Sequence, residues 1–162
     1  MHRIKVLYSE VFDPLARFTG LPIHTEYIDG IQWKLDRRVS YKIQTGGFAG
    51  HTTTVHAGFI FDWASIPRVF WNLLPPTGLS GNPYGIAALF HDWICRHREI
   101  QGQPCSRLDA DQVFLEIMLY VGVTPWVAKL MYRCVRLAGV LPWYNFDGSD
   151  DSGDYDGNAI CS

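Results

Sequence analysis

The spacing of hydrophobic and polar positions changes about 66 residues into the chain. Before that point, apolar and polar side chains alternate clearly over residues 39–43 and weakly over 32–36, and residues 52–56 are rich in β-branched side chains. Gly46, Gly47 and Gly50 separate residues 39–43 from residues 52–56. Alternation with a period of two, interrupted by glycine turns, is typical of short strands. The N-terminal part is therefore predicted to form a small antiparallel sheet.

From Pro67 onward, the apolar residues recur at helical spacing. Pro67, Pro83 and Pro125 each suit a first helical position, where a missing N–H costs nothing. A further helix is predicted to begin at Ser106, whose spacing to Asp109 resembles a capping box. The expected helices cover residues 68–74, 83–98, 106 onward and 124–139. The fold class is thus α+β: a small N-terminal antiparallel sheet followed by a C-terminal bundle of about four helices.

The length of 162 residues fits one domain, and 48% apolar residues supply a substantial core. We expect residues 1–146 to form a single α+β domain and residues 147–162 to form an acidic C-terminal tail. No internal repeat or linker interrupts the domain. The four cysteines are expected to be thiols, because a chain of this size without export signals does not need disulfides.

Charge is distributed unevenly along the chain. The net charge is −2, which argues against nucleic acid as a partner. Five aspartates and no basic residues follow position 146, which leaves 11 acidic against 14 basic side chains in the rest. The acidic tail is solvated, docks on the chain's own basic body, or docks on a partner.

The sequence predicts neither a signal peptide nor a membrane span. The first eight residues lack the apolar core and cleavage site of a signal peptide. No stretch of 18 apolar residues predicts a membrane span. Synthesis in the cytoplasm of the producing cell is therefore expected.

Five polar residues in or beside apolar stretches are the candidate catalytic residues: Asp62, His91, Asp92, Asp109 and Asp111. His91 and Asp92 interrupt an apolar helix and are the candidate metal ligands, because imidazole and carboxylate together suit a divalent ion such as Zn²⁺. A histidine beside an aspartate also suits acid–base catalysis. The cofactor is unknown on sequence alone.

A purely structural interpretation explains the same residues. His91 and Asp92 could instead form a buried hydrogen-bonded network that holds the helices to the loop before Pro67. Asp109 and Asp111 suit the N-terminal turn of a helix, and Arg107 could pair with nearby carboxylates. A zinc site made of His91, Cys95 and Cys105 is a weaker alternative, because no fourth ligand follows at a telling distance.

Several of these residues occur in an order that closely resembles a phage and prophage family, the domain of unknown function 1353. The matching motifs, over about residues 55–139, are Ala57-Gly58-Phe59, Asp62-x-Ala64-Ser65-Ile66-Pro67-Arg68, Ala87-x-x-x-His91-Asp92, Ser106-Arg107-x-Asp109-Ala110-Asp111-x-x-Phe114-x-x-x-Met118 and Met131-Tyr132-x-x-Val135-Arg136-x-x-Gly139. The resemblance implies a bacteriophage origin and a compact size. It implies no activity and no catalytic residues.

Two function hypotheses follow, with a third ranked below them. The first is a structural or assembly component of the virion, in the tail or baseplate region, which acts through contacts with other phage structural proteins. The alternative is a metal-dependent hydrolase, acting on the host cell wall through His91, Asp92, Asp109 and Asp111. An HD-type phosphohydrolase ranks last, because that fold is all-helical and the first third of this chain favours strands.

Overall fold

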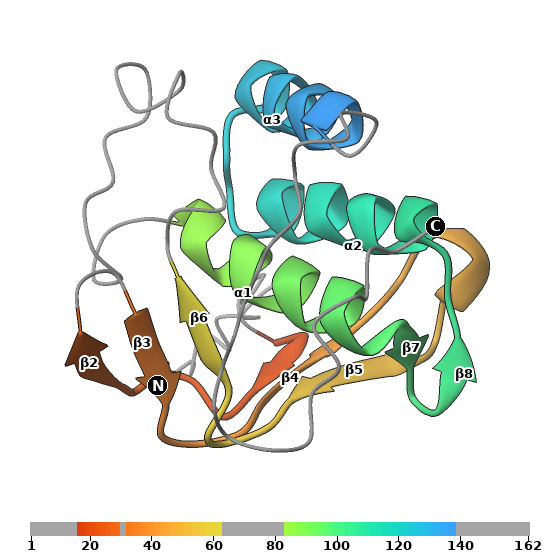
Figure 1. The fold of residues 1–162 in the computed structure, drawn as a ribbon. Helices are drawn as coiled ribbons and strands as arrows, with labels where there is room; N and C mark the ends of the chain where they lie inside the picture. The colour runs from red at the N-terminus through yellow and green to blue at the C-terminus, as the bar shows by residue number, and fades with distance from the viewer. Residues whose placement is uncertain (1–15, 30–31, 63–82, 139–162) are drawn as a thin grey trace, which may run out of the picture.

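Strands make up the first part of the described chain and helices the second, which confirms the α+β class (Figure 1). The computed structural model describes residues 16–29, 32–62 and 83–138. Its strands are β1 (Phe18–Thr19), β2 (Thr25–Asp29), β3 (Gln32–Leu35), β4 (Val39–Lys42), β5 (Thr52–Val55), β6 (Ile60–Asp62), β7 (Glu99–Ile100) and β8 (Gln103–Pro104). Its helices are α1 (Pro83–His97), α2 (Arg107–Tyr120) and α3 (Pro125–Ala138), with a 3-10 turn, η1, at Gly46–Phe48. Three of the four predicted helices are present, and the fourth, at 68–74, lies outside the described residues.

The described strands form two antiparallel sheets of three strands each, in the orders β1-β4-β5 and β2-β3-β6, and β7 pairs with β8 in a separate hairpin. Between β4 and β5, Val39 lies opposite Val55 and Tyr41 lies opposite Thr53. All four of these side chains are buried, whereas Lys42 on the same strand is exposed. The alternation seen in the sequence therefore marks the face of this sheet that meets the helices.

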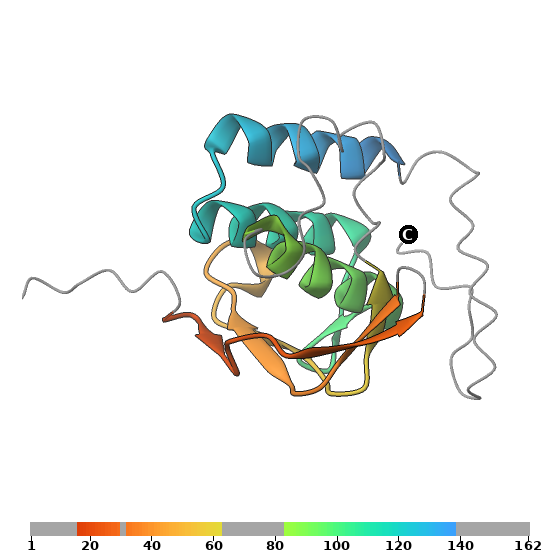
Figure 2. The same ribbon diagram turned by 90° about the vertical axis from the view of Figure 1, so that its left-hand side faces the viewer.

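The helices lie in two layers above the strands (Figure 2). α1 packs against β5 and against α2, and α3 packs against the other side of α2. Because α1 lies between the strands and α2, it carries apolar side chains on most of its circumference, and Leu89, Phe90 and Ile94 are buried. The ring of Phe90 lies 6.1 Å from that of Tyr41, which joins α1 to the sheet. No helix in the described part of the chain is long and apolar enough to cross a bilayer.

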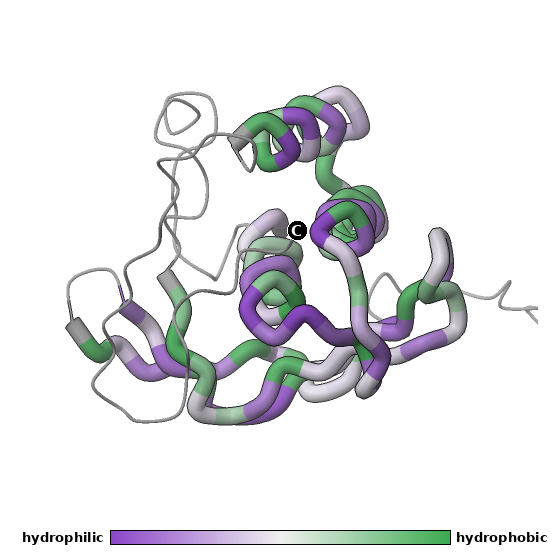
Figure 3. The backbone as a smooth tube through the Cα atoms, turned by 45° about the vertical axis from the view of Figure 1, so that its right-hand side comes forward, coloured by the Kyte–Doolittle hydropathy of each residue, from purple (hydrophilic) through white to green (hydrophobic). Residues whose placement is uncertain are grey.

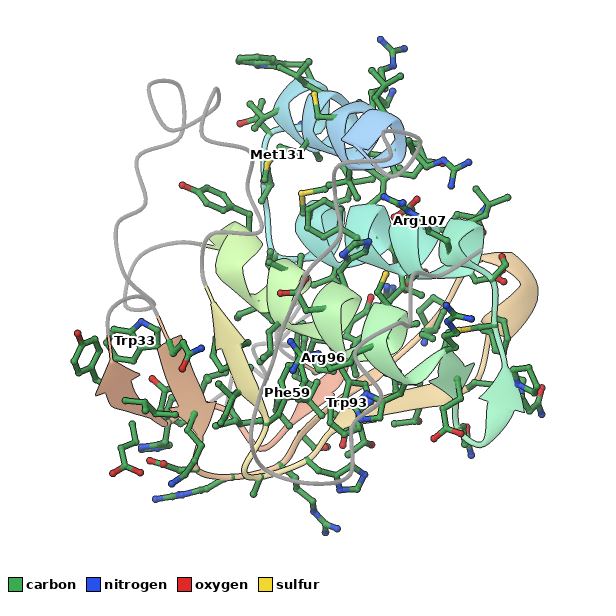
Figure 4. All side chains as sticks on the ribbon, viewed as in Figure 1. Trp33, Phe59, Trp93, Arg96, Arg107 and Met131 are labelled. Atoms are coloured by element: carbon green, nitrogen blue, oxygen red, sulfur yellow. The ribbon has the colours of Figure 1, made fainter. Side chains whose placement is uncertain are left out.

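The C-terminal half of α1 is attached to the start of β6 by aromatic and cationic contacts (Figure 4). The rings of Trp93 and Phe59 meet edge to face at 5.1 Å. Arg96 places its guanidinium 4.8 Å from the centre of the Phe59 ring and donates a 3.0 Å hydrogen bond to the carbonyl of Ile60. These contacts fix α1 relative to the sheet β2-β3-β6.

A tight hairpin turns the chain from α1 into α2. Arg98 ends α1 with a φ of 55°, while its N–H still donates to the carbonyl of Ile94. Gln101 and Gly102 form the turn between β7 and β8, both with positive φ, which matches the twist of an antiparallel pair. The N–H of Cys105 donates a 3.0 Å hydrogen bond to the carbonyl of Arg98. The start of α2 is thereby held beside the end of α1.

Candidate functional site

Asp111, on the second turn of α2, is a charged side chain with no solvent exposure. Its Oδ1 lies 2.7 Å from Nε2 of His91 on α1, and its Oδ2 accepts a 2.9 Å hydrogen bond from Nη1 of Arg136 on α3. An unpaired carboxylate would be strongly unfavourable at this depth, so these partners are what makes its burial possible. One carboxylate thus joins all three helices.

Arg107, one turn before Asp111 on α2, strengthens the same connection. Its Nε lies 3.8 Å from Oδ2 of Asp111, and its Nη2 donates a 2.7 Å hydrogen bond to the carbonyl of Val135 on α3. Figure 4 shows Arg107 between α2 and α3. We call His91, Arg107, Asp111 and Arg136 the Asp111 network.

The protonation states in the network follow from its geometry. Burial alone would lower the pKa of His91, but the hydrogen bond to Asp111 and the charge of Asp92 outweigh it and raise that pKa to about 9. Burial would likewise raise the pKa of Asp111, but the hydrogen bonds from His91 and Arg136 hold it below its usual value. At neutral pH the network therefore contains an imidazolium and a carboxylate, and His91 donates through Nε2.

These charge states limit what the network can do chemically. An imidazolium has no free lone pair, so His91 has to lose its proton before it can accept one or bind a metal. Asp111 has both oxygens engaged and no contact with solvent, so it does not reach a substrate or a water molecule. The geometry is that of a buried ion network between helices.

Asp109, two residues before Asp111, serves a separate purpose at the start of α2. Its Oδ2 accepts hydrogen bonds of 2.9 Å from the N–H and 2.6 Å from the hydroxyl of Ser106. The hydroxyl of Ser106 in turn accepts from the N–H of Asp109, which completes a capping box. The structural interpretation of Asp109 is thereby supported, with Asp109 in the place where the sequence pattern expects a glutamate.

The remaining candidate residues are Asp92 and Asp62. The Oδ1 of Asp92 lies 3.7 Å from Nδ1 of His91, so Asp92 flanks the network on the side away from Asp111. Asp62 pairs through its backbone with Gln32 at the end of β6, and its side chain lies outside the described residues. The structure therefore brings His91, Asp92 and Asp111 together and keeps Asp109 at the helix cap.

No metal site is formed by the side chains that the structure describes. Within residues 16–29, 32–62 and 83–138, no three His, Cys, Asp or Glu side chains are grouped to hold an ion. The Sγ of Cys95 does lie 3.6 Å from Nε2 of His91, but that nitrogen is directed at Asp111. No disulfide joins Cys95, Cys105 and Cys134 within the described part of the chain.

A second buried carboxylate, Glu116, was not among the candidate residues. One oxygen accepts hydrogen bonds from the hydroxyl of Tyr41 at 2.7 Å and the N–H of Gln44 at 2.9 Å. The other accepts from the N–H of Thr45 at 2.9 Å and from the Thr45 hydroxyl. Burial and the neighbouring Glu116 raise the pKa of Tyr41. Glu116 thus fixes the segment after β4 to the middle of α2.

The sequence carried one signal for Glu116: a single acid within the apolar residues 113–118 of α2. An open groove of about 730 Å³ lies beside it. Its walls are mostly apolar and are formed by Arg17, Thr45, Gly46, Gln112, Leu115, Glu116, Leu119, Tyr120, Val121 and Gly122. None of the five candidate catalytic residues lines this groove.

Comparison with known families supports the resemblance seen in the sequence. A family model described as protein of unknown function (DUF1353) matches residues 33–135, which is more than half of the chain. The matched region includes the two capping residues of α2, Ser106 and Asp109, and its two buried acids, Asp111 and Glu116. Comparison with curated proteins and with solved structures gave no significant match.

Proposed function

We propose that this chain, which belongs to the family of proteins of unknown function DUF1353, is a structural or assembly component of a bacteriophage particle. In this proposal it sits in the tail or baseplate region of the virion and acts by binding other phage structural proteins. It is not an enzyme. The phage assignment is supported by the sequence motifs that resemble the phage and prophage family, and not by a known activity.

The observation that carries the proposal is the closed geometry of the Asp111 network. A hydrolase needs a base or a metal ligand that can reach its substrate. His91 is instead protonated and bound to Asp111, and Asp111 is fully buried between His91 and Arg136. A network of this kind stabilises a scaffold, which is what a structural component requires.

Exposed apolar side chains on α3 supply a means of binding other proteins. Trp126 is 61% exposed and Leu137 is 67% exposed. Large exposed aromatic and aliphatic side chains are frequent anchors of protein interfaces. A scaffold fixed from inside by ion pairs, with such anchors outside, fits a role in assembly.

The proposal is tested on purified particles of the phage that encodes the chain. Particles are isolated by density gradient, washed in high salt and analysed by quantitative mass spectrometry. We expect the chain in a fixed copy number relative to a known tail protein, since structural contacts survive the wash. A soluble phage enzyme of similar abundance in the lysate serves as the control for carry-over.

Two results would count against a structural role. One is that the chain stays in the soluble lysate at the level of the control enzyme. The other is that purified chain binds a stoichiometric divalent metal and cleaves cell-wall material, and that His91→Ala abolishes the cleavage while the protein remains folded by circular dichroism. The second result favours the hydrolase hypothesis instead.

A further inference from the structure

The outward side of α3 combines large apolar side chains with positive charge. Trp126, Lys129, Leu130, Arg133 and Leu137 are spaced by three or four residues, so they share one side of the helix. We call these five residues the α3 outer face. All except Leu130 are exposed, and Leu130 is half-buried. Figure 3 shows the resulting mixture of hydrophobic and hydrophilic positions along α3.

The opposite side of α3 packs against α2. Ala128 and Met131 are buried, and Val135 packs against the core. Figure 4 shows Met131 directed toward α2. Arg136 is held by Asp111 at 2.9 Å, so it is not available to the outer face. The outer face is therefore left with Lys129 and Arg133 as its cations, without an acid anywhere in α3.

This composition specifies the chemistry of an occupant. Two cations with no acid on the same helix favour an anionic segment. Trp126, on the same side of the helix, favours a segment that also carries an aromatic or apolar side chain. A single exposed pair of charges contributes little to binding, so several acids in succession are needed.

The chain itself contains such a segment. Asp147–Asp156 carries five aspartates, one tyrosine and no lysine or arginine. Eight residues, 139–146, separate it from the end of α3 and can span up to about 26 Å when extended. The distance back along α3 from Ala138 to Lys129 is about 14 Å at 1.5 Å per residue. The connection is long enough for the segment to reach both cations.

We propose that the α3 outer face binds the acidic segment Asp147–Asp156 of the same chain. The tether keeps the segment at a high effective concentration, so weak individual ion pairs suffice to hold it. The contact shields Trp126 and neutralises Lys129 and Arg133. A partner that uses this face then has to displace the segment. The inference does not rest on the proposed function, because it concerns a contact within one chain.

Zero-length cross-linking of the intact chain tests the contact. A water-soluble carbodiimide couples an aspartate to a lysine amine only where the two touch, and Lys129 is one of four lysines in the chain. Mass spectrometry then gives the yield of coupling between the acidic segment and each lysine. We expect Lys129 to couple in roughly tenfold higher yield than Lys42, which is also exposed.

Two matched variants define the specificity of the contact. Arg133→Glu reverses a charge on the outer face and is expected to lower the Lys129 yield about fivefold or more. Arg37→Glu makes the same charge change on an exposed residue between β3 and β4 and is expected to leave the yield unchanged. Salt at about 0.5 M is expected to reduce the yield as well.

Three outcomes would overturn the proposal. Equal coupling to Lys42 and Lys129 would mean that no specific contact exists. An unchanged Lys129 yield in Arg133→Glu would mean that the outer face does not bind the segment. In a mixture of isotopically light and heavy chains, coupling predominantly between chains would assign the segment to a second copy.

Discussion

Two carboxylates that α2 carries into the interior, Asp111 and Glu116, are stabilised in different ways. Asp111 is compensated mainly by charge, through protonated His91 and Arg136. Glu116 is compensated mainly by hydrogen bonds from hydroxyl and backbone N–H groups, with Arg17 farther away at 3.9 Å. Both solutions satisfy the rule that a buried charge needs partners for its oxygens.

Replacing Glu116 tests whether its hydrogen bonds stabilise the buried carboxylate. Glu116→Gln keeps the size of the side chain but turns one acceptor into an NH₂ donor, which then faces the N–H of Thr45. We expect a loss of about 2 kcal/mol in the free energy of unfolding, measured by urea denaturation. Glu99→Gln, at an exposed position on β7, is the control and should change stability by less than about 0.5 kcal/mol. Equal losses in both variants would contradict the assigned role.

At the residue scale, the sequence was informative where polar groups interrupt a local apolar pattern. His91 was identified because it stands in an apolar helix. Asp111 was instead interpreted as part of the N-terminal cap of α2, and this was wrong, because its side chain is buried against His91. Glu116 was missed because its partners, Tyr41 and Gln44–Thr45, lie more than 70 residues away in the chain. Nothing local in the sequence indicates that the segment after β4 returns to α2.

At the scale of single elements, the start of α2 depends on its capping box. Ser106→Ala removes the hydroxyl that bonds Asp109 and accepts from its N–H. We expect a loss of about 1 kcal/mol in the free energy of unfolding. Gln112→Ala, at an exposed position within α2, serves as the matched control and should cost nothing, because alanine favours helices. If Ser106→Ala proves neutral, the cap does not stabilise α2.

The attachment of α3 to α2 is a second element-scale property. Arg136→Met keeps most of the aliphatic stem but leaves Asp111 without its cation on α3, and we expect a loss of about 2 kcal/mol. Arg136 is partly exposed, so this figure is smaller than for a fully buried pair. Hydrogen exchange should accelerate in α3 before it does in α1.

Arg133→Met, on the α3 outer face, is the control for that experiment. It removes the same charge without touching Asp111. Its proposed contact with the acidic segment is weak, so exchange in α3 should accelerate far less than in Arg136→Met. Equal acceleration in both variants would mean that the general charge of α3, and not the contact with Asp111, holds the helix.

The sequence predicted the described helices and the central strands, but it missed β2, which at five residues is the longest described strand. The helices at α1, α2 and α3 and the strands at β3, β4 and β5 were expected, because each shows a periodic pattern or a clear start signal. The strands β1, β7 and β8 have two residues each, and β6 has three, so they are too short to show any period. Their formation depends on tertiary contacts.

At the scale of the whole molecule, the Asp111 network connects the layers. α3 lies on α2, α1 and α2 lie on the strands, and His91, Asp111 and Arg136 reach across both helix contacts (Figure 2). Three-dimensional convergence of this kind cannot be read from the chain, because it depends on how three helices pack. We infer that this network holds the three described helices together.

The most direct test of that claim is the pH dependence of global stability. His91 has a pKa of about 9 in the folded chain against 6.5 when unperturbed, so the folded state binds the proton more tightly. Its contribution is therefore complete below pH 6.5 and is lost as the pH rises through 9. A shift of this size corresponds to roughly 3 kcal/mol.

Urea denaturation of the unaltered chain and of His91→Gln, at intervals from pH 6 to pH 9.5, measures this contribution. The account predicts that the unaltered chain loses roughly 3 kcal/mol more than His91→Gln across that range. If His91→Gln is too unstable, Asp92→Asn lowers the pKa of His91 and should move the loss to lower pH. Parallel stability curves for the unaltered chain and the variant would contradict the account, because His91 would then not be held protonated by Asp111.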